Sequence, residues 1–175
     1  LFTPYEAPSK DSLLEKIKSE LLDIQQKILK NDKTYSLFVT GHSLGGAQAT
    51  LAGVILAIDE DIRRAFTAGD PSGEGPVTVV SFASPRVGNH PFRRLHQTLE
   101  ENNHLRHLRI MNRDDVVPFL PWYSARFRIS GQYTHTGLRW ITGKDVDEGL
   151  LADISYPDIE EEQQPIVYWH PSKPG

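Results

Sequence analysis

Residues 35–46 read Tyr-Ser-Leu-Phe-Val-Thr-Gly-His-Ser-Leu-Gly-Gly, and an alanine-rich segment continues from there to about residue 60. The stretch 35–40 is short, apolar and rich in strand formers, so it predicts a buried strand. The segment after Gly46 predicts a helix. Between them, Ser43 is expected at the tip of a sharp turn in a strained backbone conformation. Gly41 and Gly45, two positions before and after it, are expected to avoid steric collisions there.

Residues 41–45 fit the pattern G-x-S-x-G, which forms the nucleophile elbow of α/β-hydrolases. The helix after the elbow directs its N-terminal amides and its dipole towards the oxyanion that forms during acyl transfer. Ser43 is therefore the candidate nucleophile, and the Leu44 N–H is the expected oxyanion donor. The pentapeptide alone arises by chance, and the alternative interpretation is a glycine-rich turn. The strand before it and the small-residue helix after it favour the elbow.

The rest of the chain alternates predicted strands and helices. A capping box of Ser12 and Glu15 opens a helix to about residue 30, whose apolar stripe predicts a crossover helix that covers the sheet rather than a lid. A second helix is predicted over 92–102, and the acidic segment 144–164 is interpreted as solvated. Further strands are predicted at 77–82, 105–111, 126–133 and 138–142. This order predicts an α/β fold with a mostly parallel sheet flanked by helices.

Composition excludes several classes of protein. The chain has 175 residues, enough for one domain. A net charge of −4 argues against a nucleic-acid partner, and the absence of cysteine excludes disulfides and thiolate metal sites. The apolar stretch Leu44 to Ile58 is too short to span a bilayer. The histidine spacing does not indicate a metal site, and no cofactor is expected.

Four ordered motifs resemble one known family. Val39–Ala47 is similar to the nucleophile segment of the fungal-type (class 3) lipases, which include the plant phospholipase A1-like acylhydrolases. The other three are Phe82-Ala-Ser-Pro-Arg-Val-Gly-Asn89, Asn112-Arg-Asp-Asp-Val-Val-Pro118 followed by Leu120-Pro121, and Tyr133-Thr-His-Thr-Gly-Leu-Arg-Trp140, which has one residue fewer before its Trp than the family pattern. The resemblance implies a partial α/β-hydrolase fold over residues 1–175.

The triad of this fold runs in the order Ser, acid, His along the chain. Asp115 follows the predicted strand 105–111 and aligns with the acid of the family's D-x-V-P pattern. Asp114 is the competing candidate, with a local turn as its alternative role. Asp115 would hold the tautomer of the histidine and stabilise the imidazolium.

The sequence leaves the identity of the catalytic histidine open. A residue beyond Gly175 is the first candidate, His170 the second and His135 the third, although His135 matches a family position that is not catalytic. His42 is interpreted as a packing and hydrogen-bonding residue. The remaining histidines, which precede the acid, are interpreted as polar helix or strand positions: His90, His96, His104 and His107.

We expect the chain to be a piece of a longer protein, since it has no initiator Met. N-terminal strands, a lid, the second oxyanion donor and a C-terminal segment would lie outside it. The resemblance implies hydrolysis of carboxylic esters of lipids at a lipid–water interface, through a Ser-Asp-His triad and an acyl-enzyme. The alternatives are a catalytically silent lipase-like binding module and an acyltransferase that uses the same serine. The sequence does not indicate the compartment.

Overall fold

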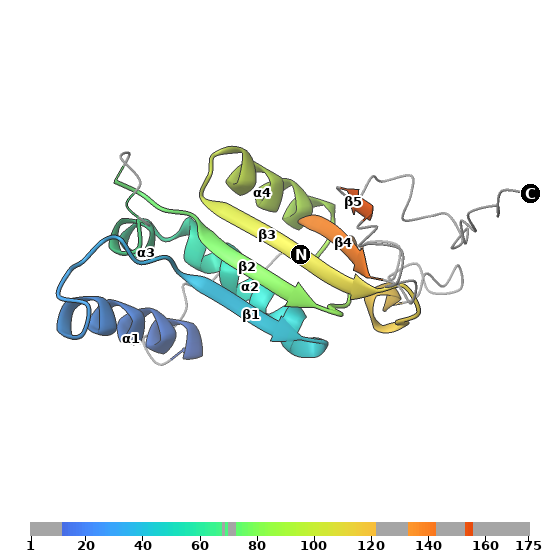
Figure 1. The fold of residues 1–175 in the computed structure, drawn as a ribbon, viewed down its shortest axis with the longest axis horizontal. Coiled ribbons are helices and arrows are strands. Elements are labelled where there is room, and N and C mark those ends of the chain that lie inside the picture. The colour runs from blue at the N-terminus through green and yellow to red at the C-terminus, as the bar shows by residue number, and fades with distance from the viewer. Residues whose placement is uncertain (1–11, 68, 70–72, 122–132, 143–152, 156–175) are drawn as a thin grey trace, which may run out of the picture.

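Five strands form one sheet in the order β1-β2-β3-β4-β5 (Figure 1). The structure is a computed structural model and describes residues 12–67, 69, 73–121, 133–142 and 153–155. Strands β1 to β4 are parallel, and β5 pairs antiparallel with β4. The strand bounds are β1 Phe38–His42, β2 Val77–Phe82, β3 Leu105–Asn112, β4 Leu138–Thr142 and β5 Asp153–Ser155. The predicted parallel sheet is confirmed.

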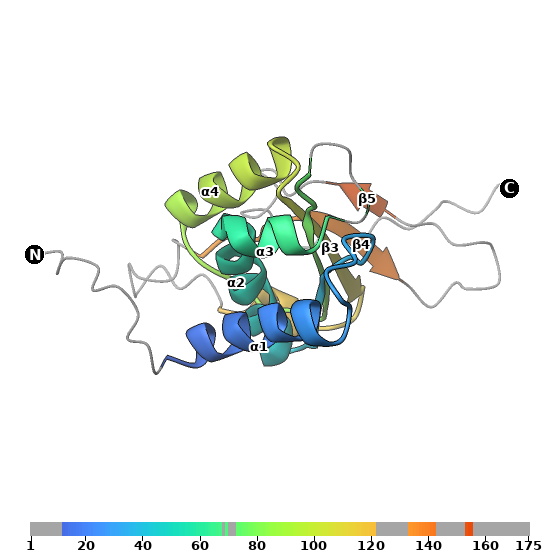
Figure 2. The same cartoon turned by 90° about the vertical axis from the view of Figure 1, so that its left-hand side faces the viewer.

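The helices that follow β1 and β2 pack against one face of the sheet. Helix α2 (Leu44–Ile58) is followed by the short α3 (Glu60–Ala65), and α4 (His90–Glu101) joins β2 to β3. Figure 2 shows α2, α3 and α4 on the same side of the strands. Small residues bring α2 close to the sheet: a Cβ on Gly53 would lie only 2.2 Å from Val79 Cγ2. This close approach fixes the helix that carries the candidate nucleophile at its N-terminus.

The core lies between this helical layer and the sheet. Strand β2 alternates buried and half-buried positions, and Val77 and Val79 are almost fully buried on the helix side. They contact a cluster that includes Ala57, Ile62 and Leu105. The period of two along β2 and β3 thus reports which face of the sheet the helices cover.

Three element predictions differ from the structure. Strand β1 begins at Phe38 rather than residue 35 and extends through His42. Most of the predicted strand 126–133 lies outside the described residues, and residue 133 is not in a strand. The acidic segment contains strand β5, which the sequence did not predict.

Helix α1 (Leu13–Lys27) confirms the predicted start but not the predicted packing. Ser12 Oγ accepts a hydrogen bond from the Glu15 N–H at 3.2 Å. The expected apolar stripe is largely exposed, with Leu13 75% and Ile28 69% accessible. Gln25 is the buried residue of the helix, Leu21 and Leu22 are half-buried against the core, and the helix also contacts α3.

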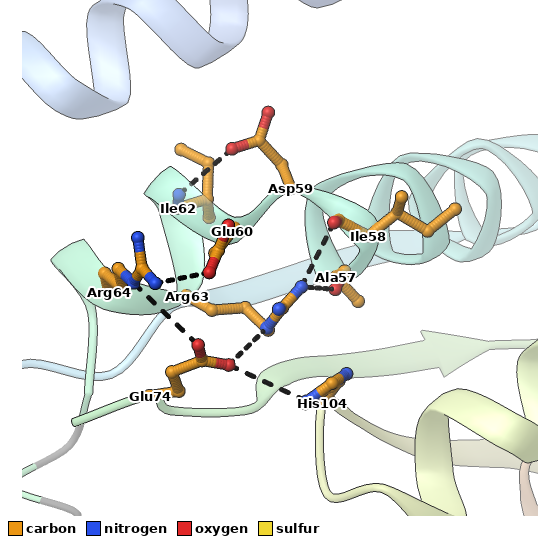
Figure 3. Close-up of polar contacts among 9 residues, drawn as sticks. All are labelled: Ala57, Ile58, Asp59, Glu60, Ile62, Arg63, Arg64, Glu74 and His104. Atoms are coloured by element: carbon orange, nitrogen blue, oxygen red, sulfur yellow. Dashed lines mark hydrogen bonds and ion pairs between the residues drawn. The ribbon is translucent and has the colours of Figure 1, made fainter. Parts of the chain in front are cut away.

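Arg63 on α3 fastens the C-terminal end of α2 (Figure 3). Its Nη1 donates to the Ala57 and Ile58 carbonyls at 2.7 and 3.1 Å, where helical carbonyls have no partner in the helix itself. Its Nε donates to Glu74 Oε2 at 3.0 Å, and His104 lies 3.7 Å from the same oxygen. The pKa of Glu74 is lowered, first by the Arg63 hydrogen bond. One carboxylate thus joins α3, the loop before β2 and the residue before β3.

Candidate active site

Ser43 lies in the predicted strand–turn–helix. It has φ 55° and ψ −125°, between the last residue of β1 and the first residue of α2. A non-glycine residue at positive φ is strained, and such strain is common at functional sites. The Ser43 N–H donates to the Phe82 carbonyl at the end of β2, 2.9 Å away. The expected strained tip and the immediate onset of the helix are both confirmed.

The two glycines of the pentapeptide are not equivalent. A Cβ on Gly41 would lie 2.1 Å from the Gly45 carbonyl oxygen, so only glycine fits there. A Cβ on Gly45 would meet nothing within 4 Å, so the predicted collision at that position was wrong. The second close approach belongs to Gly46, where a Cβ would lie 2.9 Å from the Ser84 Cβ.

The N-terminus of α2 presents amide groups beside Ser43. The first N–H groups of any helix have no partner in the helix, and they carry the positive end of its dipole. No acidic residue lies in the first turn of α2. The Leu44 side chain is 67% exposed, so this end of the helix is open to solvent.

Asp115 lies three residues beyond the end of β3. Because β1 and β3 both run parallel to β2, their carboxyl ends lie at the same edge of the sheet as Ser43. The Asp115 carboxylate is half-buried, and its Oδ1 accepts a hydrogen bond from the Val117 N–H at 2.9 Å. Asp114 is exposed. The chain thus brings the candidate nucleophile and the candidate acid to one sheet edge, as expected.

Arg86 bonds the Phe82–Asn89 motif to the acid loop, residues 113–121, and a backbone bond joins that motif to the Tyr133–Trp140 motif. The Arg86 N–H donates to the Leu120 carbonyl at 2.8 Å, and its Nη1 donates to the carbonyls of Phe119 and Pro121 at 2.8 and 3.1 Å. The next residue, Val87, donates its N–H to the Thr134 carbonyl at 3.2 Å. Sequence reasoning matched the Arg86 motif but gave this side chain no role.

His135 is buried, and its ring is hydrogen bonded to the Pro118 backbone. Burial lowers the pKa of His135 well below 6.5, and the nearby Arg109 and Arg86 lower it further. The ring is therefore neutral at physiological pH. A general base must reach the proton that it removes, and a buried ring engaged by a backbone group is poorly placed to do so.

Two histidines interpreted as ordinary polar positions are buried and linked. His96 Nε2 lies 3.0 Å from His107 Nδ1, and His107 Nε2 lies 2.9 Å from Ser81 Oγ. Burial lowers the pKa of His107 well below 6.5. A Cβ on Gly137 would lie 2.5 Å from the His107 ring, and Gly137 has φ +81°, so the glycine of the Tyr133–Trp140 motif makes room for this ring.

His42 and His170 also have roles predicted from the sequence. His42 is exposed, so the packing part of its interpretation was wrong. His170 lies outside the described residues. Within the described ranges, no three His, Asp or Glu side chains come close enough together to hold a metal ion. No helix in the described part of the chain is long and apolar enough to cross a membrane.

The sequence around Ser43 and Asp115 matches a known protein family. The family model described as "Lipase (class 3)" matches residues 7–124, which include Ser43 and Asp115. The chain belongs to the class 3 lipase family. The resemblance stated from the four motifs is thereby confirmed.

Relatives of this class 3 lipase-family chain include plant phospholipases. It is 39% identical over 113 residues to "Phospholipase A1-II 6" of Oryza sativa subsp. japonica, an alignment that covers 65% of this chain and 26% of the relative. It is 31% identical over 164 residues to "Phospholipase A1-Ialpha2, chloroplastic" of Arabidopsis thaliana, covering 91% of this chain and 31% of the relative. The chain thus spans about a fifth to a third of the curated relatives it matches.

A solved lipase shares the fold. The crystal structure of the lipase from Rhizopus microsporus var. chinensis matches with a TM-score of 0.51 and 26% identity, over 81% of this chain and 41% of that one. The predicted α/β-hydrolase fold is confirmed.

Proposed function

We propose that the protein containing this class 3 lipase-family chain hydrolyses carboxylic esters of lipids, with Ser43 as the nucleophile. The strained Ser43 between β1 and the open N-terminus of α2 is the observation that carries the proposal. A binding module has no need of a serine held at φ 55° over a helix N-terminus. The phospholipase and lipase names of the relatives favour a lipid ester substrate, met at a lipid–water interface.

The proposed reaction proceeds through an acyl-enzyme. Ser43 Oγ attacks the ester carbonyl while a histidine accepts its proton, and the carbonyl oxygen becomes an oxyanion. The Leu44 N–H donates to that oxyanion, with a second donor from outside the described residues. The alcohol leaves with a proton returned by the histidine, and water then hydrolyses the acyl-enzyme. Asp115 orients the histidine and stabilises its charged form.

The histidine of this triad is proposed to be His170 or a residue beyond Gly175. The burial of His135, its hydrogen bond to Pro118 and its lowered pKa all oppose a role as base. The acyltransferase alternative uses the same groups, with an alcohol in place of water in the second step.

The experiment uses the full-length protein. Wild type and Ser43→Ala are treated with a fluorophosphonate probe and assayed on p-nitrophenyl esters of short and long acyl chains. Ser43→Ala should abolish labelling and reduce turnover by about 10⁶-fold, because the chemical step depends on the nucleophile. Ser19→Ala, an exposed serine on α1, is the matched control and should label like wild type. A wild-type protein that is not labelled, or a labelled Ser43→Ala variant, would refute the proposal.

A further inference from the structure

We infer that Arg86 and His135 are positioning residues, which together hold the loop that carries Asp115 by donating hydrogen bonds to its backbone carbonyls. The inference rests on the proposed function for its catalytic consequence. Its structural part, that two side chains hold this loop, can be tested without any assay of activity.

The acid loop has little regular structure of its own. After β3 ends at Asn112, the internal backbone–backbone bonds of the loop include one turn from the Asp115 N–H to the Asn112 carbonyl and a single turn of 3₁₀ helix, η1 (Val117–Phe119). A single turn of helix is marginal without outside support. The position of the loop must therefore come from its contacts with the rest of the fold.

Four consecutive carbonyls of this loop accept hydrogen bonds from just two residues. His135 bonds to the Pro118 backbone, and because proline has no N–H, the carbonyl accepts and the imidazole donates. Arg86 serves the next three carbonyls, those of Phe119, Leu120 and Pro121, through its Nη1 and its own backbone N–H. Bonds to successive carbonyls fix both the position and the orientation of the loop backbone.

The His135 ring is placed where water cannot replace it. His135 is 8% exposed, and the Pro118 side chain is almost fully buried. The charges that face the ring are Arg109 and Arg139 on the sheet and Arg86 itself, and they oppose its protonation. His135 therefore acts as a neutral donor with a fixed tautomer. A variant that cannot donate leaves a buried carbonyl without a partner, which is costly.

The effect on Asp115 is short-range. Its Oδ1 is bonded to the Val117 N–H, one residue before the Pro118 carbonyl that His135 holds. A shift of Pro118 therefore moves the carboxylate that orients the proposed base. Displacements of about 1 Å in such groups lower turnover by about a hundredfold.

The test compares variants of the full-length protein that keep or remove each donor. His135→Leu removes the ring donor at similar size, while His135→Asn and His135→Gln each place an amide N–H near one of the two ring nitrogens. Arg86→Met removes the guanidinium, and Arg86→Lys retains one charged donor. Arg94→Met, an exposed arginine on α4, is the matched control. Hydrogen–deuterium exchange of residues 112–121, Tm, kcat and KM are measured for each.

We expect His135→Leu and Arg86→Met to speed exchange in residues 112–121 and to lower kcat about a hundredfold with KM nearly unchanged. At least one of the two amide variants should recover most of both losses, and Arg94→Met should match wild type. A folded His135→Leu or Arg86→Met protein with wild-type exchange in this segment would overturn the inference. So would a rise in KM at constant kcat, or a loss in Tm that both amide variants share in full.

Two safeguards keep the outcome decisive. If His135→Leu or Arg86→Met does not fold, Arg86→Lys must still show faster exchange in residues 112–121 than Arg94→Met, or the inference fails. If wild type neither labels with fluorophosphonate nor hydrolyses esters, the proposed function fails on its own. The exchange comparison then still decides whether the two residues hold the loop.

Discussion

Exchanging Gly41 and Gly45 for alanine, one at a time, tests the geometry of the elbow most directly. A Cβ on Gly41 would lie 2.1 Å from the Gly45 oxygen and 2.4 Å from its carbonyl carbon. Ordinary contacts between heavy atoms begin near about 3.5 Å, so the backbone must separate by more than about 1 Å. Both contacted atoms are backbone, and they belong to the helix that Ser43 caps, so no side-chain rotation can relieve the overlap.

The expected cost of Gly41→Ala is therefore at the upper end for overpacking, about 3 kcal/mol, which lowers Tm by about 6–12 °C in a domain of this size. Gly45→Ala meets no neighbour within 4 Å and lies in the first turn of α2. Alanine favours helix over glycine by up to about 1 kcal/mol, so this variant should equal or exceed wild type in Tm.

Thermal unfolding followed by circular dichroism measures the Tm of both variants. Fluorophosphonate labelling of the full-length protein measures the reactivity of Ser43. Gly41→Ala should label at least about a hundredfold more slowly, because the nucleophile is displaced by about 1 Å. Equal losses of Tm in the two variants would refute the steric argument, since it assigns the collision to Gly41 alone.

Two further predictions concern the acids. Asp115→Asn should lower kcat of the full-length protein by about 10⁴-fold through the wrong histidine tautomer, and Asp114→Asn should change it little; equal losses would refute the choice of Asp115. Glu74→Gln should lower Tm at pH 7, because the folded protein favours the Glu74 carboxylate and lowers its pKa. That stabilisation is complete above the unfolded pKa, near 4.5, and is lost as pH falls through the lower folded pKa, so the difference in Tm should shrink below pH 4.5. The exposed Glu101→Gln is the control, and a Tm difference that persists unchanged at pH 3 would contradict the Arg63–Glu74 contact as its source.

The parts of the fold that sequence predicted well are those governed by local chemistry. Strand β2 and the elbow follow from apolar runs, glycine positions and turn geometry, which are encoded within a few residues. The capping role of Ser12 is local in the same sense. The sheet edge shared by Ser43 and Asp115 follows from the parallel order of the strands.

The predictions that were wrong depend on partners distant in sequence. The stripe on α1 has the right period for a buried face, but Gln25 is buried instead, because its Nε2 donates to the Ala65 carbonyl 40 residues away. His96 and His107 were interpreted as polar helix or strand positions and do lie on α4 and β3, but their burial and their mutual hydrogen bond were not predicted. The hydrophobic period of a segment and the polarity of its residues do not predict such pairings.

The positions of Ser43 and of the loop that carries Asp115 were predictable, but the contacts that hold this loop were not. Arg86 and His135 lie in segments matched by motif, and their hydrogen bonds to carbonyls leave no trace in side-chain pattern. Any residue type can supply a backbone carbonyl, so the acceptor residue in such a contact cannot be recognised from the sequence.

The attachment of Arg63 to the end of α2 has an electrostatic consequence at the opposite end of that helix. An α-helix carries roughly half a positive charge at its N-terminus and half a negative charge at its C-terminus. The Arg63 guanidinium lies against the Ala57 and Ile58 carbonyls and offsets the negative half, whereas the first turn has no acidic residue to offset the positive half. Because the Glu74 carboxylate pairs with the same guanidinium, the offset at this end is partial. An anion that forms beside Ser43 still meets the positive end of the α2 dipole, with no acidic side chain in the first turn to weaken the attraction.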